Sequence, residues 1–326
     1  MSKHNMNYVG KQGPHVAYRR HGSHGPGSID GPGCIDGLDG SHSSHGIQGK
    51  LLAAMVGSLL IATLAWARPA AASPRDFVVC MPLGEGSGSA ATRHMAPLLR
   101  RMEKLAGWPA GSIKGKYITG LSACLSYVKR TKPGFALLSQ GVYLQMRRAW
   151  GLKVIGRVDM PRGAGKRLYL VVKKGSAKNL ADLKGKTLKS NHVAERAFLS
   201  KVIFRGKVRV GRFFHLKPTN SPLRGFKAVH RGRADATLVN DDELAIMKKR
   251  REGADLEVIY KSPRLPGMPV VAFRRNATSG DTSALRRVLP RLCRGPGKAT
   301  CTSSMIRGFL SGSNATYHSI QRLFGR

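Results

Sequence analysis

The side chains best suited to chemistry in this chain are hydroxyl, amide and imidazole groups, which donate hydrogen bonds to anions. One set is Ser190, Asn191 and His192, directly before a helix that the apolar pattern predicts over residues 193–204. The start of a helix offers unpaired backbone N–H groups and the positive end of the helix dipole. These three residues are therefore candidates for an anion site, although Ser190 or Asn191 would equally serve as an ordinary helix cap.

Other candidate donors lie in a glycine-rich loop and at the end of a strand. The loop 84–92 contains glycines, which let backbone amides approach a ligand, and the hydroxyl of Ser87; a plain turn explains it equally well. Ser139 and Gln140 follow the apolar run 135–138, at the strand end where open α/β sheets bind ligands. Tyr143 is expected to line the same cleft or to pack as an ordinary core tyrosine.

An acidic cluster runs from Asn240 and Asp241 to Glu243 in an otherwise very basic chain. A carboxylate in a cleft can accept a proton from an acidic ligand or pair with a ligand amine. Negative charge is also favourable in the first turn of a helix without any ligand. Both explanations of the cluster stay open at the level of the sequence.

The sequence contains no recognisable catalytic set. The histidines after Ser73 are scattered, and the chain has no H-E-x-x-H pair, no G-x-S-x-G elbow and no catalytic-cysteine signature. The glycine-rich loop lacks the lysine of a P-loop and does not match the dinucleotide fingerprint. We therefore expect a protein that is not an enzyme and needs no cofactor or metal.

The net charge indicates an anionic ligand or surrounding. The 326 residues include 56 Lys and Arg against 17 Asp and Glu, a formal charge of +39, and residues 73–326 carry +36 of it. Nucleic-acid binding usually needs basic residues on one face with aromatics between them. Here the basic pairs are spread along the chain and only 6% of residues are aromatic. We expect no nucleic-acid partner, and anionic lipid or an extracellular polymer as the alternative partner.

The N-terminal part has the features of a tail followed by an export signal. Residues 1–49 are rich in Gly, His and Ser with almost no apolar periodicity, which predicts a disordered tail. Lys50, the apolar run 51–67 and the small residues up to Ala72 match a secretory signal, so residues 50–72 are a signal peptide cut after Ala72. The alternative is an uncleaved membrane anchor, since the run is just long enough to cross a bilayer. In either case the rest is expected in the periplasm or otherwise exported.

Four cysteines follow this segment, and export makes disulfides the first expectation. Four cysteines allow three pairings. We favour Cys293 with Cys301, which closes the short loop RGPGKAT, and Cys80 with Cys124, which ties the first strand to an early helix.

Apolar runs of strand length alternate with amphipathic stretches of helix length, which predicts an α/β fold. Strands are expected at 77–81, 135–138, 153–158, 167–173, 187–190, 213–216, 236–239, 256–260 and 270–273. Helices are expected at 92–106, 120–130, 142–150, 193–204, 222–231, 241–250, 282–292, 304–310 and 316–324. Two α/β lobes fit better than one: residues 73–165 plus 270–326 form lobe 1 and 166–269 lobe 2, with hinge crossings near Leu170 and Val271.

Three phrases in this pattern resemble exported solute-binding proteins of ABC transporters, in the branch that binds phosphate, phosphite or phosphonate. They are NLADLKGKTLKSNH at 179–192, AVHRGRADATLVNDDEL at 228–244 and SPRLPGMPVVAFRR at 262–275. The resemblance implies a type II periplasmic-binding-protein fold whose two lobes close on a small oxyanion. It also implies uptake through an ABC permease in the membrane, or sensing, by a chain that we expect to be a monomer.

Overall fold

The computed structural model describes residues 75–84, 86, 88–160, 166–303 and 306–325. The tail, the signal or anchor segment and Ser87 lie outside the described residues. No helix among those described is both long and apolar enough to span a membrane.

The first sheet has six strands in the order β11-β4-β10-β3-β1-β2. β1 (Phe77–Cys80) runs parallel to β2 (Gly115–Ile118) and β3 (Phe135–Leu138), while β10 (Pro269–Phe273) is antiparallel to β3 and β4 (Leu152–Asp159). β11 (Gly308–Leu310) closes the edge beside β4. Every residue of β1, β3 and β10 is buried, as expected for strands that helices cover on both faces.

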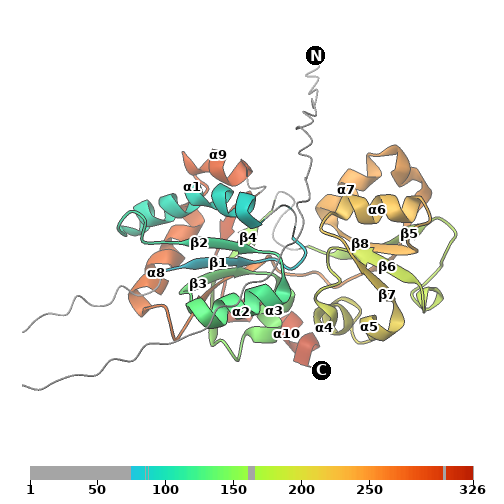
Figure 1. Cartoon of the computed structure of the whole chain (residues 1–326), viewed down its shortest axis with the longest axis horizontal. Coiled ribbons are helices and arrows are strands. Elements are labelled where there is room, and N and C mark those ends of the chain that lie inside the picture. Colours follow the sequence, from blue (N-terminus) through green and yellow to red (C-terminus); the bar gives the residue numbers. More distant parts are fainter. Residues whose placement is uncertain (1–74, 85, 87, 161–165, 304–305, 326) are drawn as a thin grey trace, which may run out of the picture. The chain divides into compact units, whose positions relative to one another are not determined.

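Two helical layers cover this sheet (Figure 1). One layer contains α1 (Gly88–Ala106), α8 (Ser279–Val288), a 3₁₀ turn η4 (Leu289–Arg291) and α9 (Gly297–Ser303). The other contains α2 (Leu121–Thr131), α3 (Gln140–Met146), η5 (Asn314–Tyr317) and α10 (His318–Gly325). Alternate residues of β1 enter different cores, because successive strand side chains point to opposite faces: Val79 packs with α1 and α8, and Val78 packs with α2 and α3.

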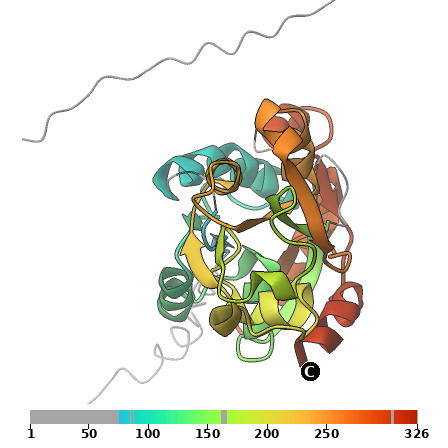
Figure 2. The same cartoon turned by 90° about the vertical axis from the view of Figure 1, so that its right-hand side faces the viewer.

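The second sheet has five strands in the order β7-β6-β8-β5-β9. β6 (Thr187–Ser190) is parallel to β7 (His215–Pro218) and β8 (Ala236–Asn240), while β5 (Leu168–Lys173) is antiparallel to β8 and β9 (Leu256–Lys261). Its helical elements, which face the viewer in Figure 2, follow in chain order. They are η1 (Ala181–Leu183), α4 (Arg196–Phe198), a π-helical turn (Leu199–Ile203), α5 (Val210–Phe213), α6 (Pro222–His230), α7 (Asp241–Lys248) and η3 (Arg251–Asp255).

The chain crosses between the sheets twice, first between β4 and β5 and then between β9 and β10. The crossings pair with each other: the backbone N–H of Lys166 donates to Leu265 O at 2.9 Å, and that of Leu265 donates to Lys166 O at 2.6 Å. The apolar runs near Leu170 and Val271 are the strands β5 and β10, which directly follow the crossings. The residue limits of the two predicted lobes stay a prediction.

Both favoured disulfides are present. Cys80 of β1 is bonded to Cys124 of α2, with their Cα atoms 5.9 Å apart, and Cys293 is bonded to Cys301 of α9, with 5.6 Å between Cα atoms. The first joins a strand to the helix that covers it, and both of its cysteines are fully buried.

Several elements differ from the predicted pattern: α1 begins at Gly88, within the loop predicted at 84–92, and the pattern misses α9. The pattern misses β2, because only Ile118 of its four residues is buried and the strand is held by backbone pairing with β1. Residues 308–310 of the helix predicted at 304–310 form β11 instead, since Phe309 is buried and pairs with Val158. The strand predicted at 213–216 starts only at His215, because residues 210–213 form the short helix α5.

The Cys80–Cys124 disulfide is expected to stabilise the fold more than Cys293–Cys301. It closes a sequence separation of 44 residues against 8. Chain entropy then predicts a loss of about 4 kcal/mol in the free energy of unfolding for Cys80→Ala/Cys124→Ala, and about 2 kcal/mol for Cys293→Ala/Cys301→Ala. Urea unfolding of both variants beside the oxidised wild type measures this, and an equal or larger loss from the second pair contradicts it.

Candidate functional site

A cavity of about 390 Å³ lies where the loop after β1 meets the second sheet. It is lined by Leu83, Lys189, Pro218, Thr219, Asn220 and Arg224. These residues lie at or after the carboxyl ends of β1, β6 and β7 and in the first turn of α6. Ligands of open α/β sheets bind at such strand ends, and the volume suits a small molecule.

The lining of this cavity offers positive charge and hydrogen-bond donors. Lys189 and Arg224 supply an ammonium and a guanidinium group, and Asn220 supplies an amide. The hydroxyl of Thr219 exchanges contacts of 3.3 Å with the backbone of Ser221 and so orders the turn before α6. No side chain caps the start of α6, so the positive end of its dipole lies beside this turn. Pro222 has no N–H group, and Arg224 N donates to Ser221 O at 3.1 Å, so the dipole rather than a set of free amides is what this helix start offers.

No carboxylate is among the described residues that line this cavity. On the first-sheet side, Leu83 has a φ of 56°, in the left-handed region that a bulky residue rarely adopts. Hydrogen bonds from Leu83 N to Thr119 O and from Gly84 N to Met81 O, both 2.8 Å, hold this conformation. Such strain, of order 1–3 kcal/mol, persists where the surroundings fix the backbone, and it clusters at binding sites.

A second cavity of about 630 Å³ is lined by residues of α6 and η3, namely His230, Arg251, Glu252, Ala254 and Asp255. It is away from the carboxyl ends of the strands, and its lining combines cations with the carboxylates of Glu252 and Asp255. Asp255 Oδ2 lies 3.2 Å from His230 Nδ1. It is therefore the weaker candidate for an anion site. Among the described residues, no group of three or more His, Cys, Asp and Glu side chains is placed to hold a metal.

Glu195, which sequence reasoning missed, joins the second-sheet elements to α3. Its Oε1 accepts a hydrogen bond from Val142 N at 2.9 Å and a short one from the Ser139 hydroxyl. A Cβ on Gly141 would lie only 2.6 Å from the Glu195 carboxyl, so glycine is needed for this approach. The carboxyl thus lies in the first turn of α3, and its burial raises the pKa of Glu195 to about 7.

Ser139 and Gln140, predicted at the end of β3, make interactions within the protein. Ser139 is the N-cap of α3 as well as the partner of Glu195. The amide of Gln140 donates to Pro266 O in the return crossing. Tyr143 is a core residue: it is 1% exposed, its hydroxyl accepts from Gln321 Nε2 at 2.9 Å, and its ring packs on Tyr317 at 5.1 Å.

The prediction of one helix over residues 193–204 is wrong. Residues 191–194 form a turn, α4 begins only at Arg196, and a π-helical turn follows. Val193, Phe198 and Val202 are buried all the same, so the apolar pattern alone does not distinguish a turn from a first helical turn. The geometric premise for an anion site at this helix start is therefore absent.

The residues of that predicted site have partners of their own. Ser190 Oγ donates to Leu238 O at 3.1 Å and accepts from His192 N at 3.2 Å, while Asn191 lies 3.3 Å from the same hydroxyl. His192 Nε2 is buried without a hydrogen-bond partner among the described residues. Its burial lowers the pKa of His192 to about 4, so the ring is neutral at pH 7.

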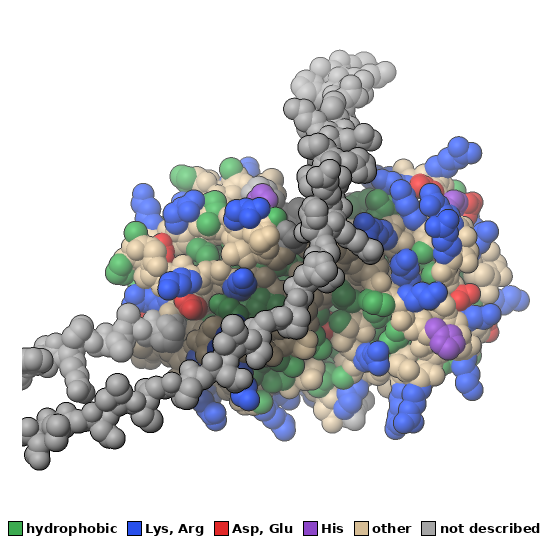
Figure 3. All heavy atoms as spheres, viewed as in Figure 1, with side chains coloured by type: hydrophobic (Ala, Val, Ile, Leu, Met, Phe, Trp, Pro, Cys, Tyr) green, Lys and Arg blue, Asp and Glu red, His purple; other side chains and the backbone are tan. Residues whose placement is uncertain are grey.

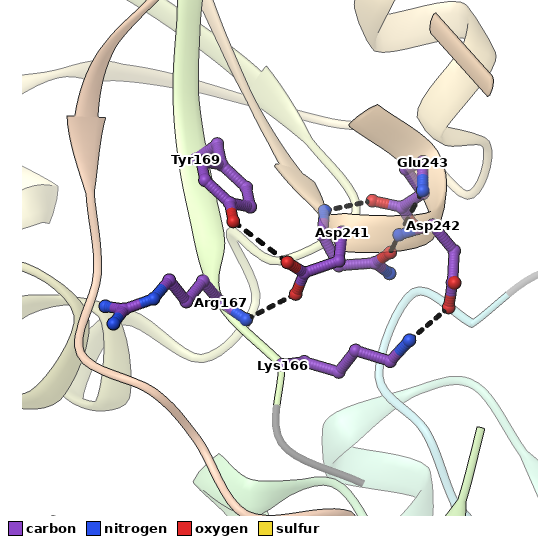
Figure 4. Close-up of polar contacts among 7 residues, drawn as sticks. Lys166, Arg167, Tyr169, Asp241, Asp242 and Glu243 are labelled. Carbon is purple, nitrogen blue, oxygen red and sulfur yellow. Dashed lines mark hydrogen bonds and ion pairs between the residues drawn. The ribbon is translucent and has the colours of Figure 1, made fainter. Parts of the chain in front are cut away.

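The acidic cluster is engaged by the chain's own groups (Figure 4). Asn240 and Glu243 form a capping box at the start of α7, in which Asn240 Oδ1 accepts from Asp242 N at 2.9 Å. Asp241 accepts from Arg167 N at 2.6 Å and from the Tyr169 hydroxyl at 2.9 Å.

Asp242 completes this arrangement with an ion pair of 2.6 Å to Lys166, the residue that bridges the two crossings. The cluster thus ties the start of α7 to the end of the first crossing.

The sequence could have indicated Lys189 and Arg224, because ligands of open α/β sheets bind at the carboxyl ends of the strands. Lys189 is at the end of β6, and the stretch from Pro218 to Arg224 follows β7, just as Ser139 follows β3. If every predicted strand end is treated as a candidate site, Lys189 and Arg224 are among the candidates. Lys189 and Arg224 do not stand out by residue type, since Lys and Arg are so frequent in this chain.

Residues 85–317 match the model of a family described as the phosphonate periplasmic substrate-binding protein of ABC transporters. A search of the curated proteins returned no match.

Solved structures with the same fold include a binding-protein component of an ABC phosphonate transporter from Pseudomonas aeruginosa. It is 17% identical with a TM-score of 0.59, over 77% of this chain and 85% of that one. Another is PhnD1 from Prochlorococcus marinus in complex with methylphosphonate, at 16% identity, a TM-score of 0.55, and 77% and 97% coverage. A Xanthomonas citri protein bound to chloride ion is 13% identical, with a TM-score of 0.58 and 77% and 96% coverage.

Glu195 is expected to make stability fall as the pH rises. Its folded pKa of about 7 exceeds the ordinary value of 4.5, so between these pH values the folded state holds a proton that the unfolded state has lost. The contribution is complete below about pH 4.5 and is lost, by up to about 3 kcal/mol, as the pH passes 7.

Urea unfolding between pH 4.5 and 8 measures this slope, which Glu195→Gln should reduce because the amide keeps size and an acceptor oxygen but does not titrate. Glu257→Gln is the matched control: Glu257 also accepts a backbone hydrogen bond, from Gly175 N at 2.7 Å, but in an exposed position. Equal pH slopes in wild type and Glu195→Gln contradict the assignment.

Proposed function

Since the chain belongs to the family of periplasmic substrate-binding proteins of phosphonate ABC transporters, we propose that it captures a small oxyanion of the phosphate, phosphite or phosphonate class. The observation that carries the proposal is the 390 Å³ cavity, which has two cations, a hydroxyl, an amide and no carboxylate among its described lining residues. Solute-binding proteins of this kind bind and release their ligand without chemical change.

The two cations of the cavity suit a phosphoryl oxyanion in different ways. The guanidinium of Arg224 can donate two parallel hydrogen bonds to two oxygens, whereas the ammonium of Lys189 acts as a compact point charge. The positive end of the α6 dipole adds a favourable potential for an anion. Asn191 and His192, which follow Lys189 closely in the sequence, remain proposed ligand contacts, and His192 would act as a neutral group.

The acidic cluster bears on which phosphonate is bound. A ligand amine would need a carboxylate partner to offset its desolvation. Both oxygens of Asp241 are occupied by Arg167 and Tyr169, and Asp242 is paired with Lys166. We therefore propose phosphate, phosphite or an alkylphosphonate as the ligand rather than an aminophosphonate. A methylphosphonate complex of the Prochlorococcus marinus relative agrees with this class.

The family places the chain among exported proteins. We propose that it releases its ligand to an ABC permease in the membrane, or presents it to a sensor, and that it acts as a monomer without a cofactor. For the N-terminal apolar run we propose a cleaved signal, with retention as a membrane anchor as the alternative.

The proposal is tested by titrating the purified full chain with phosphate, phosphite, methylphosphonate and aminoethylphosphonate. A ligand that binds only the folded state raises the melting temperature in a saturable way. We expect the first three anions to do so, with dissociation constants from calorimetry that change modestly between 50 and 300 mM salt. Aminoethylphosphonate is expected to bind at least tenfold more weakly than methylphosphonate.

Two substitutions locate the binding. Arg224→Ala and Lys189→Ala should each weaken binding of the preferred anion about tenfold or more, because each removes a charge-assisted hydrogen bond that the proposed ligand would accept. Arg231→Ala, at the other end of α6 and outside the lining, is the matched control. The proposal fails if none of the anions shifts the melting temperature, or if Arg224→Ala behaves like Arg231→Ala.

A further inference from the structure

The helical layer of α1, α8, η4 and α9 has an unusually basic outer face. Lys and Arg side chains are visible over α1 in Figure 3. We call this surface the basic face; its exposed members are Arg93, Arg100, Lys104, Arg286, Arg287, Arg291, Arg294 and Lys298. We propose that the basic face docks the protein on the head groups of an anionic lipid surface.

Chain segments far apart in sequence form this surface. α1 packs against α8 and α9. Arg101 fixes the arrangement, because its guanidinium donates to Leu292 O and to Arg294 O, both at 2.8 Å. Two basic pairs that are far apart in the sequence, Arg100-Arg101 and Arg286-Arg287, are therefore gathered on one side of the first sheet.

No exposed carboxylate offsets this charge within residues 88–106 and 279–302. The two acidic residues of these segments are Glu103 and Asp281, 3% and 6% exposed. Glu103 accepts from Ile113 N at 2.7 Å, and Asp281 pairs with Arg75 at 2.9 Å. The helices α6 and α7 differ, because α7 carries Asp241, Asp242 and Glu243 in its own first turn, and Lys227 and His230 of α6 lie near Glu252.

The chemistry of the basic face fits lipid head groups. It is rich in guanidinium groups, which bind phosphate oxygens bidentately and lose their hydration more readily than ammonium groups. The large apolar side chains exposed among the described residues, Leu223 and Ile246, belong to α6 and α7. Contact at the basic face is therefore electrostatic adsorption to anionic lipid, not insertion of apolar groups.

Two observations favour a lipid surface over nucleic acid. α1, α8 and α9 contain no Phe, Tyr or Trp, so the described face has no rings on which bases could stack. In addition, Arg75, where the described chain begins, pairs with Asp281 in the first turn of α8. In the alternative in which the apolar run 51–67 is retained as an anchor, only residues 68–74 separate it from Arg75, and this short tether would favour contact of the basic face with the bilayer.

The test is sedimentation of the full chain with vesicles of phosphatidylcholine containing 0 or 30% phosphatidylglycerol, at 50 and 500 mM salt. The variant carries Arg100→Gln, Arg286→Gln, Arg287→Gln and Arg291→Gln. The matched control carries Arg231→Gln, Arg233→Gln, Lys248→Gln and Lys249→Gln, which removes the same charge from exposed positions on the second sheet's helices. Melting temperatures and phosphate titrations verify that both variants fold and keep the cleft.

We expect the wild type to bind the anionic vesicles in a salt-sensitive manner, the variant to bind them at least tenfold more weakly, and the control to change less than threefold. The proposal is overturned if both variants lose the same amount, since net charge alone would then explain binding. It is also overturned if binding does not depend on phosphatidylglycerol, or if single-stranded DNA binds to the basic face more tightly than the vesicles do. An unchanged phosphate affinity in the variant separates this result from the proposed function.

Discussion

Carboxylates are scarce in this protein, and those in the described residues hold the fold together from within. Ten of the thirteen described Asp and Glu side chains accept hydrogen bonds from identified groups of the chain. Asp159, for example, binds Arg307 at 2.6 Å, and Asp235 accepts from Thr187 N at 2.7 Å at the start of β6. The positive charge is therefore mostly uncompensated at the surface, where water and salt screen it.

The same scarcity explains why the two sides of the cleft differ. The first turn of α3, at the end of β3, is a favourable place for negative charge, and the chain's own Glu195 already occupies it. Cations and free donors are instead found on the second sheet, at Lys189, Asn220 and Arg224. The anionic ligand that we propose would thus be bound mainly from one side, with Leu83 as an apolar wall opposite.

Much of the fold could be predicted because a strand that is buried on both faces consists of a short run of apolar residues. The strand 135–138 is observed with the predicted limits, and of the three pairings that four cysteines allow, the favoured one is present. β2 and the π-helical turn could not be predicted, since backbone pairing and tertiary contacts decide them rather than side-chain periodicity. The site was harder still: a polar residue such as Ser190 is equally suited to bind a ligand or its own backbone, and only the fold determines which it does.

The bridge between Lys166 and Leu265 has a mechanical consequence. Two separate linkers would allow the sheets to twist, slide and bend independently, whereas two linkers joined by a pair of backbone hydrogen bonds resist shear between them. Because Lys166 is also clamped by Asp242, the stiffest point of the connection lies at the start of α7. A connection paired in this way bends more easily about one axis than it shears or twists, so thermal motion between the sheets has its largest amplitude along that one bend.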